Sequence, residues 1–172
     1  MTPSPRGPRD DSSAAEPRIL SLQAAGQPAF RGLLEGIVAD ATRSLRDRGL
    51  APVAVVLDVD ESHGVATDAA LLEPLLRTAV LRAVELSTSP PADREVPHIA
   101  EVVVTSVDVG DAIEIEIADA GPGLNASSRC PADELRHLAD RAGAEVTTIA
   151  CPVGGTALTL RFPRRRARSL AA

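Results

Sequence analysis

Three residues with the spacing Asp119-x-Gly121-x-Gly123 stand directly after the run 112–118, in which apolar and acidic residues alternate as in a strand. A carboxylate accepts hydrogen bonds, and glycine, which lacks a Cβ, lets the backbone pass close to a flat ligand. This pattern is one way in which a protein brings its backbone against a purine base. The alternative is a plain turn, because Asp, Gly and Pro are also common where strands end.

The other residues that could perform chemistry form no recognisable site. The chain has two cysteines, Cys130 and Cys151, and its three histidines lie scattered at His63, His98 and His137. Zinc sites and disulfide frameworks use ligands or pairs at closer and more regular spacing. We therefore expect neither, and we assign no catalytic nucleophile or base from the sequence.

Composition limits the classes of protein to which the chain can belong. It has 172 residues, of which 44% are hydrophobic, but only two Phe and neither Trp nor Tyr. This length suits one domain with an aliphatic core. The formal net charge of −6 argues against nucleic-acid binding, which needs concentrated Lys and Arg. No apolar run is long enough to span a membrane and no secretion signal is visible, so we expect a cytoplasmic protein.

We expect one folded domain between two polar ends. Residues 1–17 are rich in Pro, Ser, Arg and Asp, which favours a disordered leader. Residues 18–163 hold the folded domain. Residues 164–172 begin with four arginines in five positions, which we interpret as a flexible, solubilising tail, with a docking role as the alternative.

Hydrophobic periodicity predicts the elements of this domain, because apolar spacings of three and four indicate helices and alternating or β-branched runs indicate strands. Thr67 or Asp68 offers a cap for the second helix, and Gly49 a stop for the first. The expected strands are 19–22, 52–59, 99–107, 112–118, 145–150 and 157–162, and the expected helices are 30–45, 68–86 and 131–142. This order favours an α/β fold, a two-layer sandwich whose mixed sheet carries helices on one face.

The element order and two motifs resemble a known family of ATPase domains. Sensor histidine kinases, gyrase B, heat-shock chaperone ATPases and MutL share this domain, called the GHKL or Bergerat fold. The resemblance covers about residues 18–163 and is to a divergent domain of the histidine-kinase type. Asp119-x-Gly121-x-Gly123 matches the first glycine box of the family, in which the Asp accepts a hydrogen bond from the adenine amino group.

The second motif is Gly154-Gly155-Thr156 with the run that follows to Pro163. It resembles the closing strand of histidine-kinase ATPase domains, where the Thr after the glycines helps to hold the adenine-reading Asp. The resemblance therefore implies that Thr156 supports Asp119, and that ATP is the ligand.

The helix predicted at 68–86 departs from the family pattern. When its leucines are aligned with those of the family, Arg82 stands where the magnesium-binding Asn would be, and Thr78 lies one turn earlier. Magnesium prefers oxygen ligands, whereas Arg has only donors, so magnesium binding stays open. A guanidinium can meet a phosphate directly, which makes Arg82 and Thr78 candidate nucleotide contacts. The alternative is that Arg82 and Glu85 form a solvated or salt-bridged helix face.

Two further departures concern phosphate binding and hydrolysis. Only residues 124–130, which contain no Gly, separate the glycine box from the next helix, whereas the family has a long glycine-bearing lid there. We therefore expect weak triphosphate binding. Gyrase-type ATPases need a Glu where this chain has Thr78, so hydrolysis is not expected. We interpret His137, on the helix after the lid, as a surface histidine.

One expectation and two alternatives follow. The expectation is a stand-alone ATP-binding domain in bacterial signalling that binds ATP or ADP weakly and works with a separate partner protein. The first alternative is a pseudo-ATPase that has lost the nucleotide and binds a signalling partner through its surface. The second is an unrelated α/β interaction domain whose glycines only form turns. The oligomeric state stays open in all three.

Overall fold

The structure is a computed structural model that describes residues 30–89, 99–122, 132–151 and 154–164. Several features singled out in the sequence lie outside these residues, namely the leader 1–17, the strand 19–22, His98, Gly123, the segment 124–130 with Cys130, and the tail from residue 165 onward. Nearly all of the remaining expected elements can be compared with the structure.

Five strands form one mixed sheet in the order β1-β2-β3-β5-β4. They are β1 (Ala54–Asp58), β2 (Glu101–Asp108), β3 (Ala112–Asp119), β4 (Glu145–Ala150) and β5 (Thr156–Pro163). β1 runs parallel to β2, and the other neighbouring pairs are antiparallel. The two predicted hairpins, β2–β3 and β4–β5, are confirmed. Because β5 lies between β3 and β4, the last of the described strands runs beside the middle strand of the sheet.

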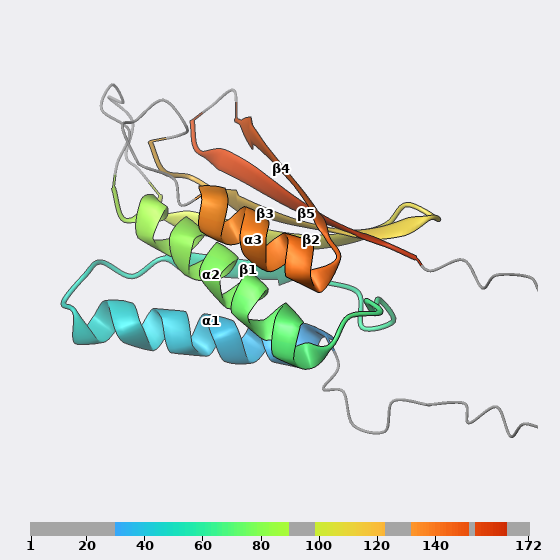
Figure 1. Cartoon of the computed structure of the whole chain (residues 1–172). Coiled ribbons are helices and arrows are strands. Elements are labelled where there is room, and N and C mark those ends of the chain that lie inside the picture. Colours follow the sequence, from blue (N-terminus) through green and yellow to red (C-terminus); the bar gives the residue numbers. More distant parts are fainter. Residues whose placement is uncertain (1–29, 90–98, 123–131, 152–153, 165–172) are drawn as a thin grey trace, which may run out of the picture.

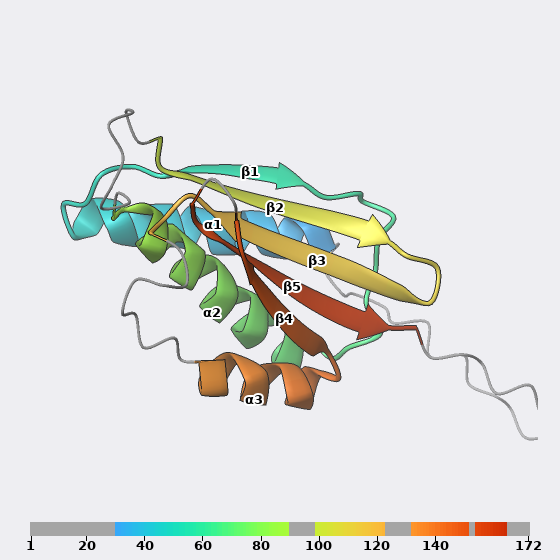
Figure 2. The ribbon, with the colours of Figure 1, turned by 90° about the horizontal axis from the view of Figure 1, so that it is seen from above.

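Three helices in the described part of the chain cover one face of this sheet (Figures 1 and 2). They are α1 (Phe30–Asp47), α2 (Ala69–Ser87) and α3 (Ala132–Ala142). α2 lies between α1 and α3 and also packs on β2 and β3. The predicted two-layer sandwich is confirmed.

The helices begin and end at residues that cap them. The Asp68 carboxylate accepts a hydrogen bond from the Ala70 backbone N–H at 2.9 Å, as expected of an N-cap. Pro74 lies inside α2, which begins at Ala69. Gly49, with a φ of 68°, ends the turn after α1 in a conformation that glycine adopts readily.

The alternation of β3 determines where its last side chain lies. Ile113, Ile115 and Ile117 are buried between the sheet and the helices. Side chains two residues apart leave the same face of a strand, so Asp119 points into this same layer. In β5, Leu160 and Phe162 are buried on that face, which places Thr156 there as well. The sheet thus carries two polar side chains into the edge of an aliphatic core.

Candidate functional site

Asp119 is the last residue of β3, and only 7% of it is exposed. Its Oδ1 accepts a hydrogen bond of 2.8 Å from the Gly121 backbone N–H. Burial raises the pKa of the Asp119 carboxyl above its ordinary value, although backbone hydrogen bonds from Gly121 and Thr156 and the charge of Arg82 oppose this shift. Asp119 is therefore a buried hydrogen-bond acceptor at the boundary of the core.

The glycines beside Asp119 are required by close backbone contacts. A Cβ on Gly121 would lie 2.6 Å from the Leu86 carbonyl oxygen and 2.8 Å from Asp119 Oδ1. A Cβ on Gly155 would collide with the Asp119 carbonyl oxygen, and Gly155 has a φ of 90°, which disfavours other residues. One glycine from each of the two motifs thus packs closely against Asp119.

Thr156 pairs with Asp119 in the register of β3 and β5 and is 6% exposed. Its backbone hydrogen-bonds the Asp119 carboxylate. Its buried Oγ1, however, has no hydrogen-bond partner among the residues that the structure describes. A buried hydroxyl without a partner costs about 1–3 kcal/mol, so this atom is suited to a bound polar group.

Arg82 lies in the last part of α2 and is half-buried. Its charge lowers the pKa of Asp119, which places the guanidinium in the neighbourhood of that carboxylate. Its buried Nε has no hydrogen-bond partner in the described part of the chain. Glu85 pairs instead with Arg48 of the segment after α1, at 2.8 Å. Arg82 and Glu85 therefore form no ion pair with each other, although Glu85 is salt-bridged on the exposed side of the helix.

The structure does not place the remaining predicted site residues, Thr78 and Gly123, against Asp119. Thr78 is half-buried one turn before Arg82, and its hydroxyl makes no hydrogen bond to another described residue. Gly123 lies outside the described residues. The structure thus brings together Asp119, Gly121 and Thr156, with Arg82 close to them.

Two residues near Asp119 were not expected from the sequence. Ser87, fully buried at the end of α2, donates a hydrogen bond of 3.0 Å to the Glu101 carbonyl, and its Oγ accepts one of 3.3 Å from the Ala120 N–H. These bonds tie the helix to the chain on both sides of the site. The only sequence signal was a polar residue at a buried helical position, four residues after Ala83.

Cys151 is the second unexpected neighbour. It lies in the connection between β4 and β5, and its N–H donates to the Gly155 carbonyl at 3.1 Å. Burial raises the pKa of its thiol, and the nearby charges of Asp119 and Glu116 raise it further. Cys151 is therefore a protonated, half-buried thiol beside the site rather than a nucleophile.

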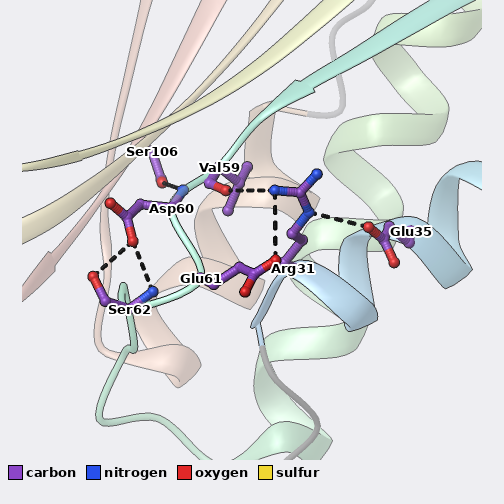
Figure 3. Close-up of polar contacts among 7 residues, drawn as sticks. All are labelled: Arg31, Glu35, Val59, Asp60, Glu61, Ser62 and Ser106. Carbon is purple, nitrogen blue, oxygen red and sulfur yellow. Dashed lines mark hydrogen bonds and ion pairs between the residues drawn. The ribbon is translucent and has the colours of Figure 1, made fainter.

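A second group of polar residues lies after β1, towards the other end of β2 (Figure 3). Asp60 accepts hydrogen bonds from the backbone and hydroxyl of Ser62 at 2.8 and 2.7 Å, and its N–H donates to Ser106 Oγ at 3.1 Å. The Ser106 hydroxyl also bonds His63 Nδ1 at 2.8 Å. Arg31 joins α1 to this segment through the Val59 carbonyl at 3.4 Å. These groups form hydrogen bonds with one another, and the bonds hold the segment that follows β1 in place.

Other kinds of site are not supported in the described part of the chain. A hollow of about 40 Å³ lies between the first turns of α1 and α2, lined mostly by apolar residues, and it is far smaller than a nucleotide needs. No group of three or more His, Cys, Asp or Glu side chains among the described residues could hold a metal ion. None of the described helices combines the length and apolar character needed to cross a bilayer.

The fold is similar to that of histidine-kinase catalytic domains. The catalytic domain of histidine kinase ThkA matches with a TM-score of 0.60 and 13% identity over 79% of this chain and 94% of that one. The cytoplasmic segment of histidine kinase QseC matches with a TM-score of 0.56 and 20% identity over 83% and 80%. Full-length ShkA in complex with AMPPNP matches with a TM-score of 0.59 and 15% identity over 80% of this chain and 30% of ShkA.

The similarity lies in the fold and not in the sequence. No protein-family model matches the sequence, and no curated protein matches it. The identities to the solved histidine kinases are at or below 20% in the three comparisons above. The expected GHKL fold of the histidine-kinase type is confirmed, as is its strong divergence in sequence.

Proposed function

Because this chain has the fold of histidine-kinase catalytic domains, we propose that it binds the adenine base of ATP or ADP at Asp119 and acts together with a separate signalling protein. One observation carries this proposal. The only buried aspartate among the described residues lies beside two close-packed glycines and pairs in register with a threonine whose buried hydroxyl has no hydrogen-bond partner among those residues. This combination suits a flat ligand with polar groups on its edge.

The donor and acceptor pattern fits an adenine edge. The exocyclic amino group of adenine is a donor, and the Asp119 carboxylate retains acceptor capacity beyond its bonds from the Gly121 and Thr156 backbones. The Thr156 hydroxyl can donate to or accept from a neighbouring ring nitrogen or a bridging water. Burial strengthens such bonds, because water competes less for the partners.

The residues fit magnesium less well than they fit the base. Arg82 replaces the expected oxygen ligand, and a guanidinium repels a cation. Its charge favours an anionic oxygen of the nucleotide instead, as does its Nε, for which no described residue is a hydrogen-bond partner. We therefore propose that binding is weak and does not depend on magnesium, with Arg82 as the phosphate contact and Thr78 beside it.

Partner binding is proposed by analogy with similar proteins. ThkA has been solved in complex with the response regulator TrrA, and that structure matches this chain with a TM-score of 0.58 and 14% identity. Hydrolysis by this chain alone is not proposed, because Thr78 has no acidic group with which to activate water.

One observation favours a second candidate function, a pseudo-ATPase that binds no nucleotide. The Arg82 charge already acts on Asp119, and Gly121 already bonds one of its oxygens. A carboxylate satisfied by its own chain would have less to gain from a base. The surface of the protein would then serve only to bind a partner.

Calorimetric titration of ATP and ADP, with and without magnesium, separates the two functions. Binding that Asp119→Asn abolishes would support the adenine site, and equal affinity without magnesium would support the role of Arg82. Asp47→Asn, at an exposed position at the end of α1, is the matched control. If the wild-type chain binds neither nucleotide at millimolar concentration, the adenine site is wrong.

A further inference from the structure

The face of the sheet opposite the helices is not covered by any described helix (Figure 2). The strand register aligns one apolar side chain from each strand across this face. The row consists of Val56, Val103, Ala118, Ala157 and Ile149. With strands about 4.8 Å apart, the row is about 19 Å long.

The ends of this row are well exposed. Val56 is 44% exposed and Ile149 is 61% exposed. Between them, Val103 and Ala118 are half-buried and Ala157 is only 3% exposed. Val107, on the same face of β2, is 47% exposed. Large aliphatic side chains gathered on one face of a folded chain mark a contact surface more often than single exposed residues do.

Acidic side chains flank the row on the same face. None of them forms an ion pair within the part of the chain that the structure describes. They are Asp58, Glu101, Glu116 and Glu145. Arg161 is the cation that the described strands place among these acids. It already forms ion pairs with Asp111 at 2.8 Å and with Glu114 at 3.8 Å. The face is therefore aliphatic in its centre and negatively charged around it.

We infer that this open face binds a protein segment or surface in which aliphatic side chains are flanked by Lys or Arg. Charge complementarity carries this choice. A second copy of the chain is disfavoured, because a two-fold contact of this face with itself would bring unpaired carboxylates together. The face measures about 19 by 26 Å, or roughly 500 Å², which corresponds to a small, transient interface. The inference is independent of the nucleotide site, which lies on the helix side of the sheet.

A labelled synthetic peptide of alternating Val and Lys serves as the probe, and the same peptide with Glu in place of Lys is its control. Fluorescence anisotropy should show binding of the basic peptide only. Ile149→Ser and Asp58→Lys should each weaken it about fivefold. Leu50→Ser and Asp47→Lys, which change an exposed aliphatic residue and an exposed acid away from this face, should leave it unchanged. Thermal unfolding checks that all four variants fold.

Amide chemical shifts locate the bound peptide. Perturbations concentrated on the outward residues of β1, β2 and β5 would support the inference. Perturbations confined to the helices, or equal binding of the acidic peptide, would overturn it. A dimer in sedimentation velocity that Ile149→Ser dissociates would assign the face to a second copy instead. A chain shortened to end at Pro163 lacks the basic tail. If this shortened chain binds the peptide more tightly, the tail itself occupies the open face.

Discussion

Asp119 and Thr156 face each other across β3 and β5, where the first is the last residue of its strand and the second is the first residue of its own. Directly opposed residues in an antiparallel pair lie about 4.5–5.5 Å apart. The carboxylate of one motif and the hydroxyl of the other therefore lie side by side at the edge of the core. This pairing makes the two glycine-containing motifs a single site.

Removal of the Asp119 charge should stabilise the nucleotide-free chain at neutral pH. Burial raises the pKa of this carboxyl above its ordinary value of 3.8. The folded chain then holds the proton more tightly than the unfolded chain, so stability is lost as the pH rises from 3.8 through the higher folded pKa. The gain in free energy of unfolding on Asp119→Asn should be smallest below pH 3.8 and grow above it.

Urea unfolding at a series of pH values measures this gain. Asp58→Asn, at an exposed position on β1, is the matched control for loss of a carboxylate. A gain from Asp119→Asn that shrinks as the pH rises would show that the folded chain favours the charged carboxylate.

Alanine in place of Gly121 or Gly155 should destabilise the fold by about 1–3 kcal/mol, because each Cβ would meet backbone atoms and Gly155 has a positive φ. Nucleotide binding should weaken as well if Asp119 moves. Gly36→Ala, in open space on α1, should instead stabilise by about 0.5–1 kcal/mol. Chemical unfolding of the three variants is the measurement, and similar effects at all three positions would argue against tight packing around Asp119.

Arg82→Ala should distinguish phosphate binding from base binding. We expect the affinity for ATP and ADP to fall about tenfold or more, the value of a hydrogen bond to a charged group, and the affinity for adenosine to change little. Titration of the three ligands gives the comparison. Arg46→Ala, in the last turn of α1, controls for the change in net charge. An equal loss for adenosine would make Arg82 a structural residue.

Ser87→Ala should destabilise the chain by about 1–3 kcal/mol, because it removes the hydroxyl that joins α2 to Glu101 and Ala120. Thermal or urea unfolding measures this effect. Ser44→Ala, at an exposed position in α1, should be neutral or slightly stabilising. If the two variants have equal stability, the Ser87 bonds contribute nothing net to holding the helix against the sheet.

Much of the fold could be predicted from local pattern. Seven of the expected strands and helices were found close to their predicted bounds, although the strand expected at 52–59 forms only as Ala54–Asp58. This strand is at the edge of the sheet, and its length is limited by its pairing with β2 from Glu101 onward. Helical spacing, alternation and capping residues act over a few positions, so they are readable in the sequence.

The sequence by itself determined the identity of the elements, the position of Asp119 before Gly121 at the end of a strand, and the position of Arg82 in the second helix. Only the tertiary structure decided that Thr156 pairs with Asp119, that Ser87 ties α2 beneath the site, and that one apolar row crosses the open face. The physical reason is that propensities act between residues close in sequence. Sheet order and register depend on contacts between distant segments, and these form only when the whole core packs.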